Sequence, residues 1–236
     1  MHESSMLRMK WFKEYYCSDG DNTKVVLDVG SYCCIEEHPT YHSFFNDKSF
    51  KYVGLDMVEG PNVDIPVKRS YKWDEVSDDF CDILISGQVF EHIEFPWITM
   101  MEIVRVVKPN GLICIIAPNG LGMHRAPVDC WRYYSDGMIA LAKWTGLEIL
   151  HVSTNLAPQG SGEQWYGEWQ DCMLIARKPE GTIKKIDFTE YVCEPIDLEK
   201  IATGFVPMNK QKWYFQYRLK QYFRSIFRPI IGLIKT

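Results

Sequence analysis

The stretch Lys24-Val25-Val26-Leu27-Asp28-Val29-Gly30-Ser31 decides the fold. Four of the five residues from Val25 onward are apolar and three are β-branched, a pattern typical of a strand buried on both faces of a parallel sheet. Gly30, two residues after Asp28, allows a tight turn at the carboxyl end of this strand. Ligands of open α/β sheets bind at that edge. The stretch therefore predicts a first central strand with a ligand site at its end.

A second short apolar run, Lys51–Asp56, also ends in an acidic residue. Asp28 and Asp56 at neighbouring strand ends predict a nucleoside pocket, because a carboxylate accepts hydrogen bonds from ribose hydroxyls. The loop after Gly30 lacks the further glycines of the dinucleotide fingerprint G-x-G-x-x-G, which disfavours nicotinamide and flavin cofactors. S-adenosylmethionine, a ligand with a ribose and no phosphates, tolerates this bulkier loop.

Three motifs carry a family resemblance: Tyr52-Val53-Gly54-Leu55-Asp56-Met57, Ser86-Gly87-Gln88-Val89-Phe90-Glu91-His92 and Pro127-Val128-Asp129-Cys130-Trp131-Arg132. With them the chain, from about Lys24 to about Lys178, resembles the class I S-adenosylmethionine-dependent methyltransferases, in particular bacterial small-molecule and glycan-type members. The resemblance implies an α/β fold with a Rossmann-like, doubly wound, mostly parallel seven-stranded sheet and an antiparallel last strand. It also implies S-adenosyl-L-methionine as cofactor and methyl transfer to a small-molecule, sugar or glycan-precursor acceptor.

Carried over residue by residue, the resemblance places the cofactor at the ends of three strands. The expected cofactor-binding residues are Asp28, Gly30, Ser31, Asp56, Met57, Ser86, Gly87 and Gln88. Met57 packs either on the adenine or in the ordinary core. The family's usual D-x-G-x-G loop is Asp28-Val29-Gly30-Ser31-Tyr32 here. This departure supports a second hypothesis, a catalytically weak protein of the same fold that binds a membrane surface or a partner through its basic C-terminal helix.

His92 and His124 are the catalytic candidates, because an imidazole with an unperturbed pKa of about 6.5 suits proton removal at neutral pH. A structural role for each is the alternative. The long loop Leu121–Ser135 has a length typical of functional loops. Arginine beside aromatic residues suits an anionic or sugar-like acceptor, although a solvated salt bridge would use the same residues. The expected acceptor-binding residues are Arg125, Asp129, Trp131, Arg132 and Tyr133.

Length and composition predict one substantial domain with terminal additions: the 236 residues are 46% hydrophobic. We expect an N-terminal helix in residues 1–23, a methyltransferase domain in 24–180 and a C-terminal extension in 181–236. Eight scattered cysteines without a C-x-x-C pair, and histidines without ligand-like spacing, predict neither disulfides nor a metal site. The chain shows no signal-peptide pattern and no apolar run long enough to span a membrane, which predicts a cytoplasmic location.

The C-terminal residues 209–236 differ in charge from the rest of the chain. They contain seven Lys or Arg and no acidic residue, so the remaining 208 residues carry a net charge of -12. Apolar residues from Phe215 to Ile230 recur at helical spacing. Two interpretations stay open: peripheral contact with the inner face of a membrane, and packing on the chain's own domain or on a second subunit of a homodimer. Nucleic acid is not an expected partner, because the body is acidic and contains no binding motif.

Hydrophobic periodicity predicts the remaining elements. The segment Glu36–Phe45 is expected to form a short helix in which Pro39 must lie early. The other predicted helices are 4–16, 97–107 and 136–144, and the other predicted strands are 63–67, 81–86, 112–117, 147–152 and 172–176.

Overall fold

The computed structural model describes residues 3–17, 22–33, 39–120, 122–125, 127–154 and 170–181, all of which lie within one compact unit, Met1–Gly204. The C-terminal extension, with its expected helix, lies outside the described residues.

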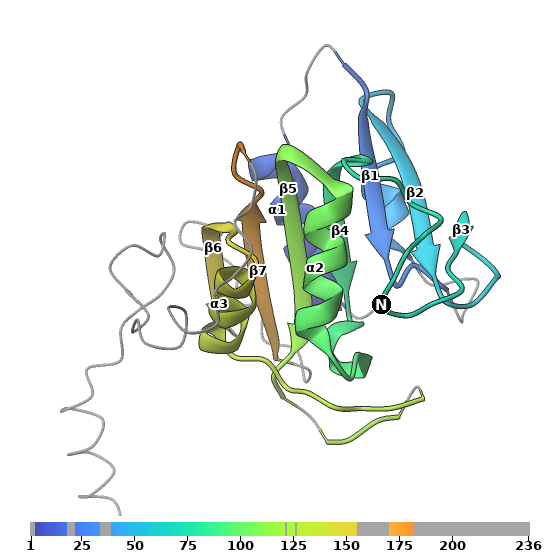
Figure 1. Ribbon diagram of the computed structural model, residues 1–236. Helices are drawn as coiled ribbons and strands as arrows, with labels where there is room; N and C mark the ends of the chain where they lie inside the picture. Colours follow the sequence, from blue (N-terminus) through green and yellow to red (C-terminus); the bar gives the residue numbers. More distant parts are fainter. Residues whose placement is uncertain are drawn as a thin grey trace, which may run out of the picture. The chain divides into compact units, whose positions relative to one another are not determined.

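The described residues form a seven-stranded sheet with the order β3-β2-β1-β4-β5-β7-β6 (Figure 1). Pairing is parallel from β3 to β5, and β7 is antiparallel to both β5 and β6. This confirms the predicted fold class. The strands are β1 (Lys24–Val29), β2 (Phe50–Asp56), β3 (Ile65–Pro66), β4 (Cys81–Gly87), β5 (Val107–Pro118), β6 (Glu148–Thr154) and β7 (Asp171–Arg177).

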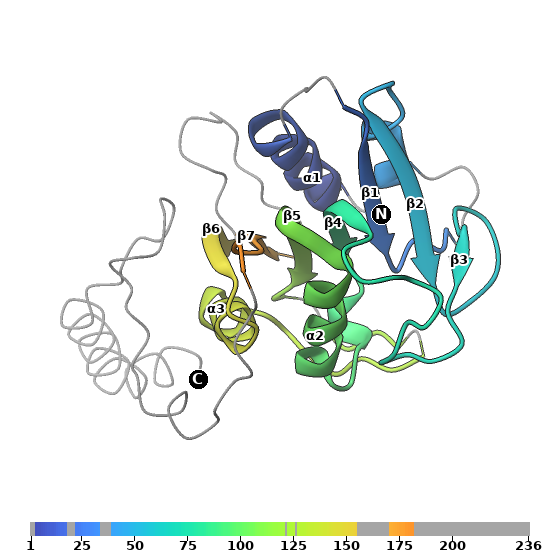
Figure 2. The same ribbon diagram turned by 45° about the horizontal axis from the view of Figure 1, so that its top comes forward.

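Helices cover both faces of the sheet, as Figures 1 and 2 show. Helix α1 (Glu3–Tyr16) packs on one face, where Met9 and Phe12 are fully buried against β-strand side chains. Helices α2 (Pro96–Val106) and α3 (Ser135–Trp144) pack on the other, with Ile103 and Met138 fully buried. Strands such as β1 are apolar at successive positions because they contact both of these layers.

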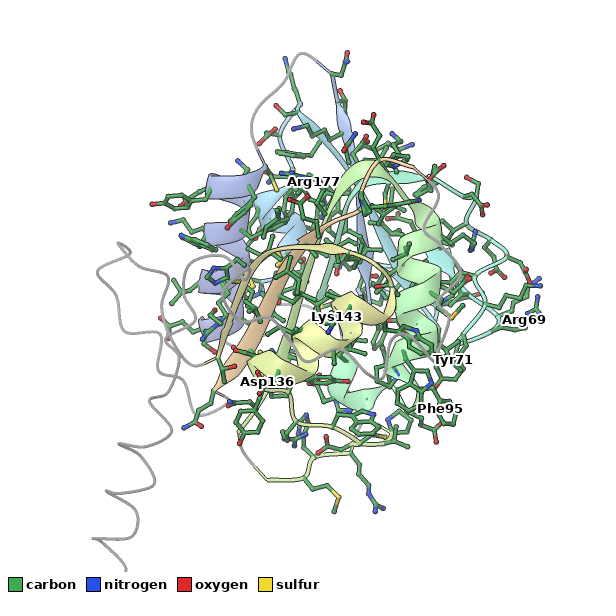
Figure 3. All side chains as sticks on the ribbon, turned by 60° about the vertical axis from the view of Figure 1, so that its left-hand side comes forward. Arg69, Tyr71, Phe95, Asp136, Lys143 and Arg177 are labelled. Atoms are coloured by element: carbon green, nitrogen blue, oxygen red, sulfur yellow. The ribbon has the colours of Figure 1, made fainter. Side chains whose placement is uncertain are left out.

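The short helix α3 carries charges that suit its dipole. Asp136 lies in its first turn and Lys143 in its last, at the two ends of the element in Figure 3. Its side chains Met138, Ile139 and Ala142 are buried, so packing on the sheet stabilises the helix more than its charges do.

The prediction of a helix over Glu36–Phe45 was wrong in its described part. Only a 3-10 turn, η1 (Tyr41–Phe44), forms there, and Pro39 and Thr40 precede it without helical structure. Proline lacks an amide hydrogen and disfavours helical geometry in the residue before it, which accounts for the late start. A second 3-10 turn, η2 (Phe90–His92), follows β4. No described helix is long and apolar enough to cross a membrane.

Strand β5 begins earlier than predicted, at Val107, where α2 ends. Its pairing with β4 shifts between Cys81 and Ile83, and Asn110 has φ +64°, so the predicted helix stop at 108–111 forms an irregular strand start. This irregularity lies at the amino end of the strand. The carboxyl ends of β1, β2 and β4 are regular and adjoin one another, and they bring the predicted site residues to one edge.

Candidate active site

The backbone N–H groups of the loop after β1 donate hydrogen bonds to other atoms of the protein. The N–H groups of residues 30–33 donate in turn to Leu55 O at 2.8 and 3.2 Å, to Asp56 Oδ2 at 3.0 Å and to Pro61 O at 3.1 Å. A cradle for a pyrophosphate needs such N–H groups to point at the ligand. The geometry of this loop therefore excludes the phosphate site of a dinucleotide cofactor.

Gly30 is fixed by backbone geometry and by packing. Its φ is +82°, a region that residues with a side chain rarely adopt, and an added Cβ would lie 2.1 Å from a Val89 methyl carbon. Glycine is needed here because the segment after β4 packs onto the turn after β1. Ser31, the next residue, is buried, and its hydroxyl has no hydrogen-bond partner.

Asp56 ends β2 beside this loop. Its Oδ2 accepts the Tyr32 N–H at 3.0 Å and its Oδ1 accepts the Val58 N–H at 3.2 Å. An ionised carboxylate offers about four acceptor positions, so two remain for a ligand. Met57 is 58% exposed, which rules out ordinary core packing for its side chain. Both residues are accessible to a ligand, and their roles toward a ribose and an adenine stay predictions.

Asp28 lies inside β1 with its side chain fully buried. Its Oδ2 accepts the Tyr52 hydroxyl at 2.5 Å, and Asn62 donates to the same tyrosine oxygen at 2.9 Å. Its Oδ1 has no partner. Burial raises the pKa of Asp28 to about 7, and the hydrogen bond from Tyr52 only partly opposes this. Asp28 is therefore a proton-binding group close to neutral pH.

The end of β4 is occupied by contacts within the protein. The Ser86 hydroxyl donates to Val29 O at 2.9 Å and joins β4 to β1. An added Cβ on Gly87 would lie 1.9 Å from the Tyr41 hydroxyl oxygen, so glycine makes room for that ring. Gln88 has φ +60° and turns its amide toward α1. Of these three predicted cofactor residues, Ser86 contributes to the sheet and not to an open surface.

A buried polar network lies where α1 meets the start of β7. Asp171 accepts the Ser4 hydroxyl at 2.6 Å and the Gln88 amide at 3.0 Å, and it forms an ion pair with Arg8 at 3.7 Å. Both charged side chains are fully buried. Ser5 exchanges a hydrogen bond of 2.6 Å with Tyr41. This network fixes α1 against the carboxyl edge of the sheet.

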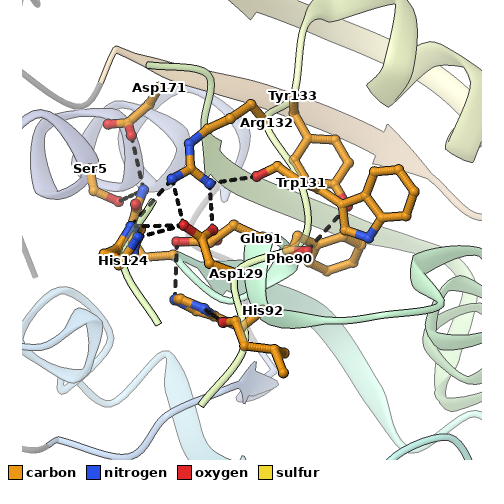
Figure 4. Close-up of polar contacts among 12 residues, drawn as sticks. Ser5, Phe90, Glu91, His92, His124, Asp129, Trp131, Arg132, Tyr133 and Asp171 are labelled. Carbon is orange, nitrogen blue, oxygen red and sulfur yellow. Dashed lines mark hydrogen bonds and ion pairs between the residues drawn. The ribbon is translucent and has the colours of Figure 1, made fainter. Parts of the chain in front are cut away.

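A second polar cluster forms where the loop of residues 122–134 returns to η2 (Figure 4). The N–H groups of Cys130 and Trp131 donate to Glu91 O at 2.7 and 3.3 Å. The Tyr133 hydroxyl donates to Phe90 O at 3.1 Å. These bonds bring His124 next to His92, with ring centroids 5.0 Å apart and planes nearly perpendicular.

Arg132 and Asp129 hold the loop in shape. Arg132 donates to both Asp129 oxygens, at 2.5 and 2.8 Å, and to the Gly120 and Gly122 carbonyls at 3.0 and 2.9 Å. Asp129 also accepts the His124 N–H at 2.6 Å. Hydrogen bonds from Arg132 hold the pKa of Asp129 well below its usual range. This pair is internal to the loop, so the salt-bridge interpretation of these two residues is supported.

The other expected acceptor residues differ in position. Arg125 is exposed on the loop, whereas Tyr133 is buried beneath it. Trp131 is 39% exposed, donates to Ile93 O at 2.9 Å and adjoins Trp97. Phe95 continues this aromatic surface. The ring centroids of Phe95 and Tyr71 lie 5.5 Å apart, and both residues are labelled in Figure 3.

Glu91 is the residue that sequence reasoning missed. Its side chain is 1% exposed, its Oε2 has no hydrogen-bond partner, and its Oε1 lies 3.6 Å from His92 Nε2. Burial raises the pKa of Glu91 to about 8. The available signal was an acidic residue within the largely apolar run 89–93, next to a candidate base.

The imidazole of His92 has a defined tautomer when neutral. Its Nδ1 lies 2.5 Å from Val128 O, and because a carbonyl only accepts, Nδ1 carries the proton. Nε2 then presents a lone pair toward Glu91. His124 Nδ1 lies 3.5 Å from Asp129 Oδ2 and 3.4 Å from Arg132. The sequence predicted no metal site because of histidine spacing, but the fold gathers potential ligands that spacing does not reveal.

Comparison with known proteins agrees with this geometry. Residues 17–115 match the family described as a methyltransferase domain. Over these residues the chain is similar to methyltransferases. An uncharacterized methyltransferase of Mycobacterium leprae, present in strains Br4923 and TN, is 30% identical over 103 residues, which are 39% of this chain and 36% of the relative. The chain thus spans about a third of the length of the curated relatives it matches.

Solved structures share the fold at low identity. The 1,6-didemethyltoxoflavin-N1-methyltransferase of Burkholderia thailandensis, solved with 1,6-didemethyltoxoflavin and S-adenosylhomocysteine, has a TM-score of 0.56 and 14% identity, covering 75% of this chain and 80% of that one. The [4+2]-cyclase SpnF has a TM-score of 0.55 and 17% identity, covering 75% and 82%. Since one of these proteins is named as a methyltransferase and the other as a cyclase, fold similarity alone does not define the reaction.

Proposed function

We propose that the chain transfers a methyl group from S-adenosylmethionine to a hydroxyl of a small-molecule or glycan-precursor acceptor. The proposal rests on the hydrogen bonding at the carboxyl edge of β1 and β2. There, Asp56 keeps acceptor capacity for a ribose while the adjoining loop has no free N–H of residues 30–33 for a phosphate. This combination suits a nucleoside cofactor without phosphates.

The buried Asp28 supports the same assignment. One of its oxygens lacks a hydrogen-bond donor, and a buried carboxyl oxygen of this kind costs free energy unless a partner reaches it. The amino group of a methionine moiety is such a donor. Ser31, whose buried hydroxyl also has no partner, lies on the loop that follows the same strand.

The acceptor belongs beside η2, where Glu91, His92 and His124 meet. Methyl transfer from a sulfonium needs alignment and, for a hydroxyl acceptor, removal of its proton. His92 Nε2 is suited to take that proton, because Nδ1 already donates to Val128 O. The methyl group then bonds to the acceptor oxygen, and the sulfonium leaves as the neutral thioether S-adenosylhomocysteine. Trp131 and Trp97 offer apolar surface for a sugar ring next to this cluster.

Isothermal titration of the full chain with S-adenosylhomocysteine and, separately, with NAD tests the cofactor. The expected result is binding of one S-adenosylhomocysteine per chain and no binding of NAD. Binding of NAD with no binding of S-adenosylhomocysteine would overturn the proposal. Failure of both ligands to bind would favour the catalytically weak alternative.

A further inference from the structure

The side chains of Glu91, His92 and His124 offer three ligand atoms that all lie within 4.8 Å of one another. Two come from η2 and one from the loop 32 residues later, and the hydrogen bonds from Cys130 and Trp131 to Glu91 O hold the two segments together. We propose that these three side chains bind a divalent transition-metal ion, Zn²⁺ in the first instance, with a fourth position open.

The distances suit such an ion. Ligand atoms about 2.1 Å from one tetrahedral ion lie about 3.4 Å apart. His92 Nε2 and Glu91 Oε1 are already at 3.6 Å. The His124 ligand atom lies within 4.8 Å of the other two, and the His124 side chain is 34% exposed and so has room to move closer.

The surroundings of the ligands also match those of metal sites. A metal-binding histidine generally donates its other ring N–H to a carbonyl or carboxylate, which fixes the ring. His92 does this with Val128 O. His124 Nδ1 lies 3.5 Å from Asp129 Oδ2 and 3.4 Å from Arg132 Nη2. These contacts orient the two rings before any ion arrives.

The charges leave a place for a cation. Arg132 is neutralised by the two hydrogen bonds it donates to Asp129, whereas Glu91 is buried with no lysine or arginine paired to it among the described residues. With neutral histidines and Glu91 ionised, as a metal ligand would be, Glu91, Asp129 and Arg132 together carry one negative charge, which a bound cation would offset.

Ligand chemistry selects the kind of ion. Two imidazoles and one carboxylate favour Zn²⁺, Fe²⁺ or Mn²⁺ over Mg²⁺ and Ca²⁺, which prefer oxygen ligands. Three protein ligands with an open position are typical of catalytic sites. A bound ion would occupy the His92 lone pair, so metal binding and the proton transfer proposed for His92 exclude each other. This inference concerns binding, and it holds whatever the acceptor is.

The test is isothermal titration of the chelator-treated full chain with Zn²⁺, and with Mg²⁺ as a comparison. The expected result is one Zn²⁺ site that Glu91→Gln, His92→Gln and His124→Gln each weaken by more than the roughly 10- to 100-fold typical of losing an outer partner. Glu94→Gln, His42→Gln and Cys130→Ser are matched controls: each changes an exposed side chain outside the three ligands and should leave the affinity unchanged.

Absence of Zn²⁺ binding, or binding that the three ligand variants leave intact, would overturn the inference. Loss of binding in Cys130→Ser alone would do the same, because it would place the ion on that exposed thiol. Circular dichroism checks that each variant is folded, and if Glu91→Gln fails to fold, the more exposed His124→Gln decides. S-adenosylhomocysteine binding without Zn²⁺ binding removes only this inference, and the reverse removes only the proposed function.

Discussion

Carboxylates at the carboxyl edge of the sheet fall into two groups. Asp171 and Asp129 each pair with an arginine, Arg8 and Arg132 respectively. Asp28, Asp56 and Glu91 form no ion pair with lysine or arginine among the described residues, although Asp28 and Glu91 are almost fully buried.

Pairing with arginine distinguishes the carboxylates that stabilise the fold from those that we propose bind a ligand. A carboxylate paired with arginine ties chain segments together: Asp171 joins α1 to β7, and Asp129 joins Arg132 to the backbone of His124. A buried carboxylate without a cation destabilises the fold when it ionises, and such a group is retained where a ligand completes it. On this basis we propose that the unpaired carboxylates mark the cofactor side, at Asp28 and Asp56, and the acceptor side, at Glu91.

The largest effect is expected from breaking a paired carboxylate. Asp171→Ala leaves Arg8 buried without its partner, and we expect the free energy of unfolding to fall by about 3–5 kcal/mol, as for other broken buried ion pairs. Urea unfolding followed by circular dichroism measures it. The control is Arg177→Ala, whose pair with Glu148 is about half exposed and should contribute less than about 1 kcal/mol. Equal effects in the two variants would contradict a structural role for Asp171.

The unpaired Asp28 should lower the free energy of unfolding at neutral pH, whereas the paired Asp171 raises it. Its folded-state pKa of about 7 lies above its unfolded value, so its contribution to stability is complete below the unfolded pKa and is lost as pH rises through 7. A shift of this size corresponds to at most about 4 kcal/mol. Asp28→Asn should therefore reduce the decline in stability between about pH 4 and pH 8, while Glu91, whose pKa rises to about 8, leaves a decline of similar size. Urea unfolding across this range checks the prediction. An unchanged dependence of stability on pH would show that the pKa of Asp28 is not raised in the folded protein.

On the acceptor side, His92→Ala should reduce turnover of a hydroxyl acceptor by about a hundredfold or more, because the group that activates the hydroxyl is lost. Affinity for S-adenosylhomocysteine should stay the same, since His92 is not among the residues expected to bind the cofactor. Glu94→Gln, an exposed neighbour, is the control. A loss of less than about threefold would instead indicate catalysis by alignment alone.

Much of the fold was predictable from sequence because its strands are apolar at successive positions. The run from Val25 to Val29 and the acids Asp28 and Asp56 gave the central strands and their ligand-facing edge. The segment Glu36–Phe45 was mispredicted because its few apolar residues do not outweigh the effect of Pro39.

The site was predictable only in part, because side-chain direction and long-range contacts are not local properties. Sequence placed Ser86 at a strand end, but nothing in it shows that the hydroxyl bonds to Val29 O. Likewise, the juxtaposition of Glu91 with His124 depends on hydrogen bonds between a turn and a distant loop. A tight turn at Gly30 was predicted, but the close packing of Val89 against it appears only in three dimensions.

The most direct test of the distinction between paired and unpaired carboxylates is the affinity of S-adenosylhomocysteine for Asp56→Ala, measured by isothermal titration beside Asp82→Asn. Asp82 is paired with Lys108 at the amino end of β4, so its variant should bind like the unmodified chain. Asp56→Ala should bind more weakly by about 1.5–3 kcal/mol, the range for a hydrogen bond to a charged group. Unchanged affinity in Asp56→Ala, with the protein folded, would contradict the assignment of the unpaired carboxylates to ligand binding.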